Sequence, residues 1–225
     1  DHRDLHSFPT RRSSDLDVLG ISDLVEKVLK IHKEENTKKR IRKPQINIST
    51  SFFIPKAWTP FQWQAQITES EMQEKQSLLA NHLRYGGVKY IWHDSENSIV
   101  QGIISRGDRR IGKVIEEVWQ NGGWLESWNE EFSYERWQKA MQKYNLSIEF
   151  YTSRTRQLDE MFPWDHIGSG VNKQFLINEY QRAKQGLITS ECRADCQHCG
   201  ALIYQTGVCL DRKSTRLNSS HITIS

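Results

Sequence analysis

This sequence of 225 residues has a small net charge and contains only five prolines and four cysteines. A formal charge of +3 is too small to indicate nucleic-acid binding by itself. No apolar stretch reaches the roughly 20 residues that a membrane-spanning helix needs, and no internal repeat or low-complexity segment is present. The four cysteines gather in one stretch instead of forming a spread disulfide scaffold, which favours a reducing cytoplasm.

Aromatic residues, by contrast, are plentiful. Eight Trp, eight Phe and seven Tyr within a 36% apolar composition are enough to build a core for one or two domains.

The two terminal segments, 1–16 and 211–225, have neither a helical nor a strand period. Both resemble translated sequencing-library adapters, one at each end, and such segments are excluded from reasoning about the fold. The native part is then expected to be 17–210, without an authentic start or stop.

The first native segments predict an α/β unit. Residues 21–36 have the apolar face of an amphipathic helix, with Ser22 as the N-cap. Residues 46–54 alternate as a strand with small polar side chains on one face, and a loop bounded by prolines follows at 55–63. A strand of this kind suits a barrel wall whose apolar side meets helices and whose polar side lines the lumen.

The later segments are predicted to be mostly helical. A capping box from Thr68 to Glu71 opens a helix over 68–85. The other helices are expected at 95–105, 108–121, 133–145 and 171–185, with short strands at 88–93 and 147–151. Four tryptophans at helical spacing are interpreted as core: Trp119, Trp124, Trp128 and Trp137.

All four cysteines lie within 191–210: Cys192, Cys196, Cys199 and Cys209. The first three form C-x3-C-x2-C, and nine residues separate the third from the fourth. Thiolates are soft metal ligands, so this spacing predicts a metal site. Structural zinc and an iron–sulfur cluster both fit four thiolates.

Four blocks of sequence resemble one known family. They are ISTSFFIPKAWTPFQW at 48–63, SRGDRRIGKVIEEVW at 105–119, FPWDHIGSGVNKQFLINEYQRA at 162–183 and TSECRADCQHCG at 189–200. In that order they are similar to the cobalamin-binding radical S-adenosylmethionine (SAM) protein family, whose reaction is uncharacterised. The resemblance implies that 17–66 is the end of a partial TIM-type radical SAM barrel, 67–190 a helical C-terminal extension and 191–210 a cysteine-rich metal site.

The resemblance also implies an activity for the whole protein. Such an enzyme cleaves SAM reductively at a [4Fe–4S] cluster to form a 5′-deoxyadenosyl radical, and whether cobalamin takes part stays open. The cobalamin-binding domain, most of the barrel and the SAM-cluster cysteines would lie upstream, so the fragment alone is expected to be inactive. Within this chain, Ser49, Ser51 and the loop beginning at Pro55 would lie nearest the cofactor.

Radical SAM enzymes hold their cluster with the same C-x3-C-x2-C spacing that this chain has at 192–199. Here, however, the motif comes late, Gln197 stands where an aromatic residue is usual, and Cys209 offers a fourth ligand. The four cysteines are therefore interpreted as an additional site, holding zinc or an auxiliary iron–sulfur cluster, and the SAM cluster itself stays as the alternative for 192–199.

Two other groups suggest chemistry. Asp165 and His166 could act as an acid and a base in catalysis. The preferred interpretation is structural, with Trp164 as a buried aromatic plug and Asp165 as a cap before the glycine turn. The arginines Arg106, Arg109 and Arg110 could grip a phosphate or carboxylate. Together with the basic run at 38–43, these arginines define the alternative function, a zinc-stabilised RNA-binding module.

Overall fold

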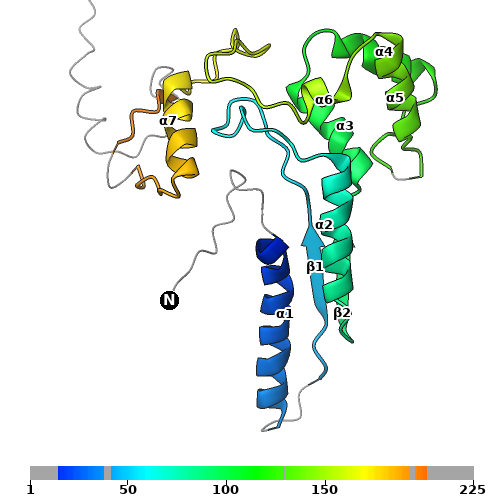
Figure 1. Cartoon of the computed structure of the whole chain (residues 1–225), viewed down its shortest axis with the longest axis vertical. Helices are drawn as coiled ribbons and strands as arrows, with labels where there is room; N and C mark the ends of the chain where they lie inside the picture. The colour runs from blue at the N-terminus through cyan, green and yellow to red at the C-terminus, as the bar shows by residue number, and fades with distance from the viewer. Residues whose placement is uncertain (1–14, 38–41, 129, 193–195, 202–225) are drawn as a thin grey trace, which may run out of the picture. The chain divides into compact units, whose positions relative to one another are not determined.

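The computed structural model describes residues 15–37, 42–128, 130–192 and 196–201. It is a mixed α/β structure, mostly helical, with one small parallel sheet (Figure 1). Among the described residues, no helix combines the length and apolarity that crossing a membrane requires.

The described residues form two compact units. The first unit contains the described residues up to Pro55 together with those in Gln64–Thr155, and the second contains Lys56–Trp63 together with the described residues from Arg156 onward. The first unit holds α1 (Asp15–Asn36), β1 (Ile46–Thr50), α2 (Glu69–His82), β2 (Val88–Trp92), α3 (Ser95–Arg106), α4 (Ile111–Gln120), α5 (Tyr134–Lys143) and α6 (Ile148–Tyr151). The second unit holds α7 (Lys173–Lys184).

The first unit begins with a helix–strand–helix–strand segment. Strands β1 and β2 are parallel neighbours, with Ile46 opposite Val88, and α2 connects them (Figure 1). Both α1 and α2 cover the same face of this sheet, because one apolar cluster joins Val25 of α1 and Leu79 of α2 to alternate residues of both strands. The expected alternation of β1 is confirmed, since Asn47 and Ser49 are exposed on the other face.

Helix α2 begins with the predicted capping box. The Thr68 amide donates to Glu71 Oε2 at 2.9 Å, and the Glu71 amide donates to Thr68 Oγ1 at 3.3 Å. These bonds satisfy two of the amides that a helix start leaves unpaired.

Helices α2 to α6 enclose a mostly aliphatic core. Met72, Ile103, Val114 and Met141 come from four different helices and are nearly inaccessible to water. Helix α3 contacts α2, α5 and α6 and so lies at the centre of this group.

The second unit has a different core, built from aromatic rings. Trp63 lies 5.9 Å from Phe162 and 5.8 Å from Tyr180 between ring centroids. Gln62 Oε1 accepts hydrogen bonds from the Trp58 amide at 3.0 Å and the Trp164 indole at 2.9 Å. The buried amide of Gln62 thereby ties its loop to the segment that precedes α7.

Three sequence predictions about the elements are wrong. Helix α1 begins at Asp15, so Ser22 is a buried interior residue whose hydroxyl donates to the Leu19 carbonyl. Strand β1 ends at Thr50 instead of residue 54.

The third error concerns 147–151, which contains helix α6 and no strand. Ser147 is its N-cap and accepts from the Phe150 amide at 3.1 Å. A run of five residues is too short for its period to separate strand from helix. The described strands form a two-stranded sheet and no barrel.

Candidate functional site

Of the three residues predicted to lie near a cofactor, Ser49 is in β1, whereas Ser51 and Pro55 follow the end of that strand. Ser49 is on the exposed face of the sheet, and Ser51 is exposed directly after the strand. Pro55 is buried, and it is the last residue of the first unit before the chain enters the second unit. Both serines are therefore accessible, Ser49 on the face of the sheet that the helices leave uncovered, whereas Pro55 has a packing role.

The cysteine stretch is partly described. Cys192 is exposed, Cys196 and Cys199 are half-buried, and none of these three forms a disulfide. Cys209 lies outside the described residues. Among the residues that are described, no group of three His, Cys, Asp or Glu side chains is arranged to hold a metal ion.

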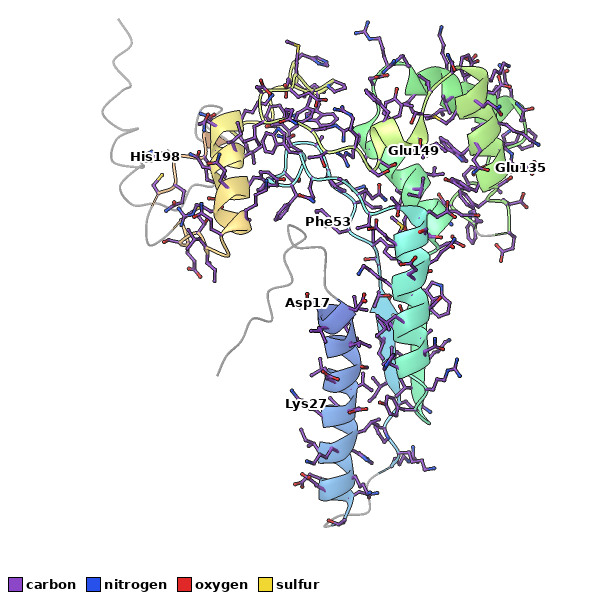
Figure 2. The ribbon with its side chains drawn as sticks, viewed as in Figure 1. Asp17, Lys27, Phe53, Glu135, Glu149 and His198 are labelled. Carbon is purple, nitrogen blue, oxygen red and sulfur yellow. The ribbon has the colours of Figure 1, made fainter. Side chains whose placement is uncertain are left out.

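The backbone of residues 196–199 is irregular and bends at Gly200. His198 and Gly200 have left-handed backbones, with φ of +52° and +93°, on either side of Cys199. Left-handed residues let a short segment fold back on itself, and only a few residue types adopt them easily. The Cys199 carbonyl accepts a hydrogen bond of 2.7 Å from the Asn172 amide. Figure 2 shows His198 beside α7.

The donor set fits a thiophilic metal only in part. Cys196 and Cys199 have the spacing of a C-x2-C pair, and both are half-buried. Among the described residues, neither Cys192 nor any other His, Cys, Asp or Glu side chain completes a three-ligand group with them, and Cys209 lies outside those residues.

The aromatic-plug interpretation of 164–166 accounts for the geometry. Trp164 is buried in the second unit's core, while His166 is exposed. Asp165 Oδ2 accepts from the Phe162 amide at 2.9 Å and from Lys173 Nζ at 2.6 Å. These contacts make Asp165 a local cap and ion-pair partner, because its carboxylate is engaged within the protein.

The arginine group is divided by the fold. Arg110 forms an ion pair of 2.6 Å with Asp108. The hydrogen bond from Arg110 is the main cause that lowers the pKa of the Asp108 carboxyl, and the Tyr151 hydroxyl at 3.3 Å adds to the effect. Arg109 is exposed, but Arg106 is only 2% exposed. The three side chains therefore do not form one phosphate-binding surface.

Sequence reasoning missed a buried polar cluster around Arg106. The Thr152 carbonyl accepts hydrogen bonds from Arg106 Nη1 at 2.9 Å and from the backbone N–H of Gln66 at 3.0 Å. The Gln66 side chain donates to the Ser98 carbonyl at 2.8 Å. No periodicity could reveal this cluster, because its members come from three separate segments of the chain: Gln66, helix α3 and Thr152.

The tryptophans divide as well. Trp137 is buried, as predicted, and its indole donates to Glu126 Oε2 at 2.9 Å. Trp119, Trp124 and Trp128 are 59%, 73% and 63% exposed, so their assignment to the core is wrong. Trp119 comes directly after Val118, the last buried residue of α4, and so lies off the buried face of the helix. Trp124 and Trp128 lie in the irregular segment after α4.

Comparison with known proteins returned no relative: no family model, no curated protein and no solved structure matches the chain.

Proposed function

We propose that this chain is part of a radical SAM enzyme, containing the end of its barrel and a helical extension with a thiol-based metal site. The observation that carries the proposal is the segment from α1 to β2. Its two strands are parallel and its two helices pack on one face of the sheet. One-sided coverage is typical of a barrel wall, whereas doubly wound sheets carry helices on both faces.

The uncovered face supports the same conclusion. Asn47, Ser49 and Lys89 are exposed there, and so is the apolar side chain of Ile91. Parallel sheets in globular proteins are normally covered on both faces. A lumen closed by further strands would cover this face and would place the Ser49 and Ser51 hydroxyls toward a bound cofactor.

The cysteines supply the second part of the proposal. Cys192, Cys196, Cys199 and Cys209 would hold zinc or an auxiliary iron–sulfur cluster, and cobalamin would bind to a separate domain. In the whole enzyme, SAM and its own [4Fe–4S] cluster supply the radical when bound. This chain's residues would shape the cavity and stabilise the extension.

The decisive experiment uses the native gene product with its upstream sequence. We expect a further C-x3-C-x2-C motif upstream, and formation of 5′-deoxyadenosine from SAM under anaerobic reduction. Substituting the upstream cysteines should abolish that product, whereas Cys196→Ser should leave SAM cleavage measurable. The 225-residue chain by itself should form none. An upstream sequence without the motif would refute the proposal.

The metal is identified by a separate measurement on the 225-residue chain. Reconstitution with iron and sulfide under anaerobic conditions should give a coloured protein if the site holds a cluster. A colourless protein that retains one zinc ion would exclude the cluster.

A second candidate function is the zinc-stabilised RNA-binding module. The observation that favours it is the exposure of Trp119, Trp124 and Trp128, since exposed rings can stack on bases. Burial of Arg106 and pairing of Arg110 with Asp108 weaken it. RNA affinity that falls steeply with salt, and that is lost in Trp124→Ala, would favour the module over the enzyme.

A further inference from the structure

We propose that the end of helix α4 and the segment after it form a docking surface for a basic, partly apolar segment of a partner protein. The surface, called the tryptophan patch, consists of Ile115, Trp119, Trp124, Leu125 and Trp128. These five side chains are between 44% and 73% exposed. All of them belong to the first unit, and the proposal does not depend on the radical SAM assignment.

Local hydrogen bonds hold the patch against α4. The chain folds back directly after that helix, where the Gly123 amide donates to the Val118 carbonyl at 2.9 Å. The Trp124 indole N–H donates to the Trp119 carbonyl at 2.9 Å. The Trp124 ring therefore keeps its one donor inside the protein and presents its apolar faces to solvent.

Glu126 anchors the same segment to α5. Its carboxylate accepts hydrogen bonds from Arg136 Nη1 and, at 2.9 Å, from Trp137 Nε1. Trp137 is buried in the first unit's helical core. The residues from Gly123 to Glu126 are therefore fixed to both helices, and the exposure of the rings between them is a feature of the folded chain.

The area of the patch is that of an interaction surface. Each aromatic ring offers roughly 150–250 Å² for burial, so three indoles that are more than half exposed present on the order of 300–400 Å². The largest apolar patch on a monomeric protein is about this size and is often functional. Tryptophan is also among the residues that most often carry the binding energy of an interface.

The charge around the patch indicates the kind of partner. Residues 111–133 contain five Glu and one Lys, which gives this segment a net charge of −4, whereas the whole chain carries +3. Three of these glutamates are exposed: Glu116, Glu130 and Glu131. Glu116 lies on α4, and the other two follow Trp128. Acidic side chains therefore border the patch.

The neighbouring helix α5 does not cancel this charge. Each of its three cations is already paired with a glutamate: Lys143 with Glu117, Arg136 with Glu126 and Lys139 with Glu135. These pairs use up cations and anions in equal number. The exposed glutamates of the border therefore keep an excess of negative charge.

A basic protein segment complements such a surface. Lys and Arg cations are attracted to the face of an indole ring, and opposite charges across an interface favour association. Apolar side chains of the same segment would cover Ile115 and Leu125. RNA fits less well, because the glutamates that attract a cation repel a phosphate backbone.

The test is calorimetric titration of the whole chain with three probes. The first is a synthetic peptide composed of arginine and leucine. The second is the same peptide with glutamate in place of arginine, and the third is single-stranded RNA composed of uridine. We expect saturable binding of the arginine–leucine peptide that weakens as salt rises, and no binding of the glutamate–leucine peptide.

A substitution in the patch locates the contact. Trp124→Ala should weaken binding of the arginine–leucine peptide about tenfold or more, because it removes the most exposed ring of the patch. Met161→Ala is the matched control, since Met161 is 85% exposed and lies in the other unit. It should leave the affinity unchanged.

A second set of variants tests the charge of the border. Glu116→Gln, Glu130→Gln and Glu131→Gln combined should weaken binding about three- to tenfold at low salt and flatten its salt dependence. Glu74→Gln, at an exposed position of α2, should change neither. Circular dichroism of each variant should match that of the parent chain.

Four outcomes overturn the proposal. The arginine–leucine peptide fails to bind, or it binds with an affinity that Trp124→Ala leaves unchanged. RNA binds more tightly than the peptide and is lost in Trp124→Ala, which would make the patch a nucleic-acid surface. The unliganded chain forms a dimer that Trp124→Ala dissociates, which would make a second copy the occupant. None of these outcomes bears on SAM cleavage by the whole enzyme.

Discussion

The two units of this protein build their cores in different ways. The first unit's helical core is mostly aliphatic and draws three buried side chains from each of α3, α4 and α5, with one more from α2 and one from α6. The second unit's core is aromatic, and most of its members lie in loops before α7. Removing one aliphatic side chain leaves most contacts of the first core in place, whereas the aromatic core depends on its central ring, Trp63.

The largest expected effect comes from removing that ring. Trp63→Ala should destabilise the second unit by about 3–5 kcal/mol, because it leaves a cavity where a fully buried indole packs. Hydrogen exchange should report opening of α7 with little change in α3.

Trp124→Ala is the matched control, since its ring is mostly exposed and its loss should change stability by less than about 0.5 kcal/mol. Equal effects of the two substitutions would contradict the central role of Trp63.

Two glycines of the first unit test how tightly its core is packed. A Cβ at Gly102 would lie 2.0 Å from Gln66 Oε1 and 3.1 Å from Thr152 Cγ2. Because the Gln66 side chain is buried and held by Ser98, Gly102→Ala should cost about 1–3 kcal/mol in chemical denaturation.

The partner variant is Gly112→Ala in α4. No atom lies within 4 Å of the added Cβ, and alanine favours the helix, so a gain of about 0.5–1 kcal/mol is expected. A Gly102→Ala protein as stable as the parent would mean that the Gln66 cluster can rearrange freely.

The predicted capping box gives a smaller effect. Thr68→Ala removes the acceptor of the Glu71 amide and should destabilise the first unit by about 1 kcal/mol. Thr68→Ser keeps that acceptor and should be nearly neutral. Urea denaturation of the two variants measures the difference.

The smallest effect is a dependence on pH. The Arg110 hydrogen bond lowers the pKa of Asp108 in the folded protein. Its contribution to stability is therefore present above the unfolded pKa of about 3.9 and is lost as pH falls through the lower folded value. Asp108→Asn should remove this part of the acid sensitivity, measured as the denaturation midpoint between about pH 5 and 2.

Local signals in the sequence were the most informative. Thr68 and Glu71 predicted the start of α2 because both partners of the capping box lie within one turn. The alternation in β1 predicted which side chains face the helices. Neither inference needed knowledge of distant residues.

Features that depend on tertiary packing could not be read in this way. Arg106 donates to the Thr152 carbonyl, which lies 46 residues further along the chain. A partner at that separation leaves no local sequence pattern, so the burial of Arg106 could not be predicted. Cys199 contacts Asn172, the N-cap of α7, through a backbone hydrogen bond that no side-chain pattern encodes. The exposure of Trp119 likewise depends on which neighbours cover α4.

The small parallel sheet has a practical consequence for handling this protein. Within the described part of the chain, the outer edges of β1 and β2 pair with no third strand. Ile91 and Phe53 are also more than two-fifths exposed near them. Unpaired backbone edges beside apolar side chains are templates for intermolecular association. Measurements on the isolated chain therefore belong at low concentration, and Ile91→Lys is the substitution of choice to improve its solubility.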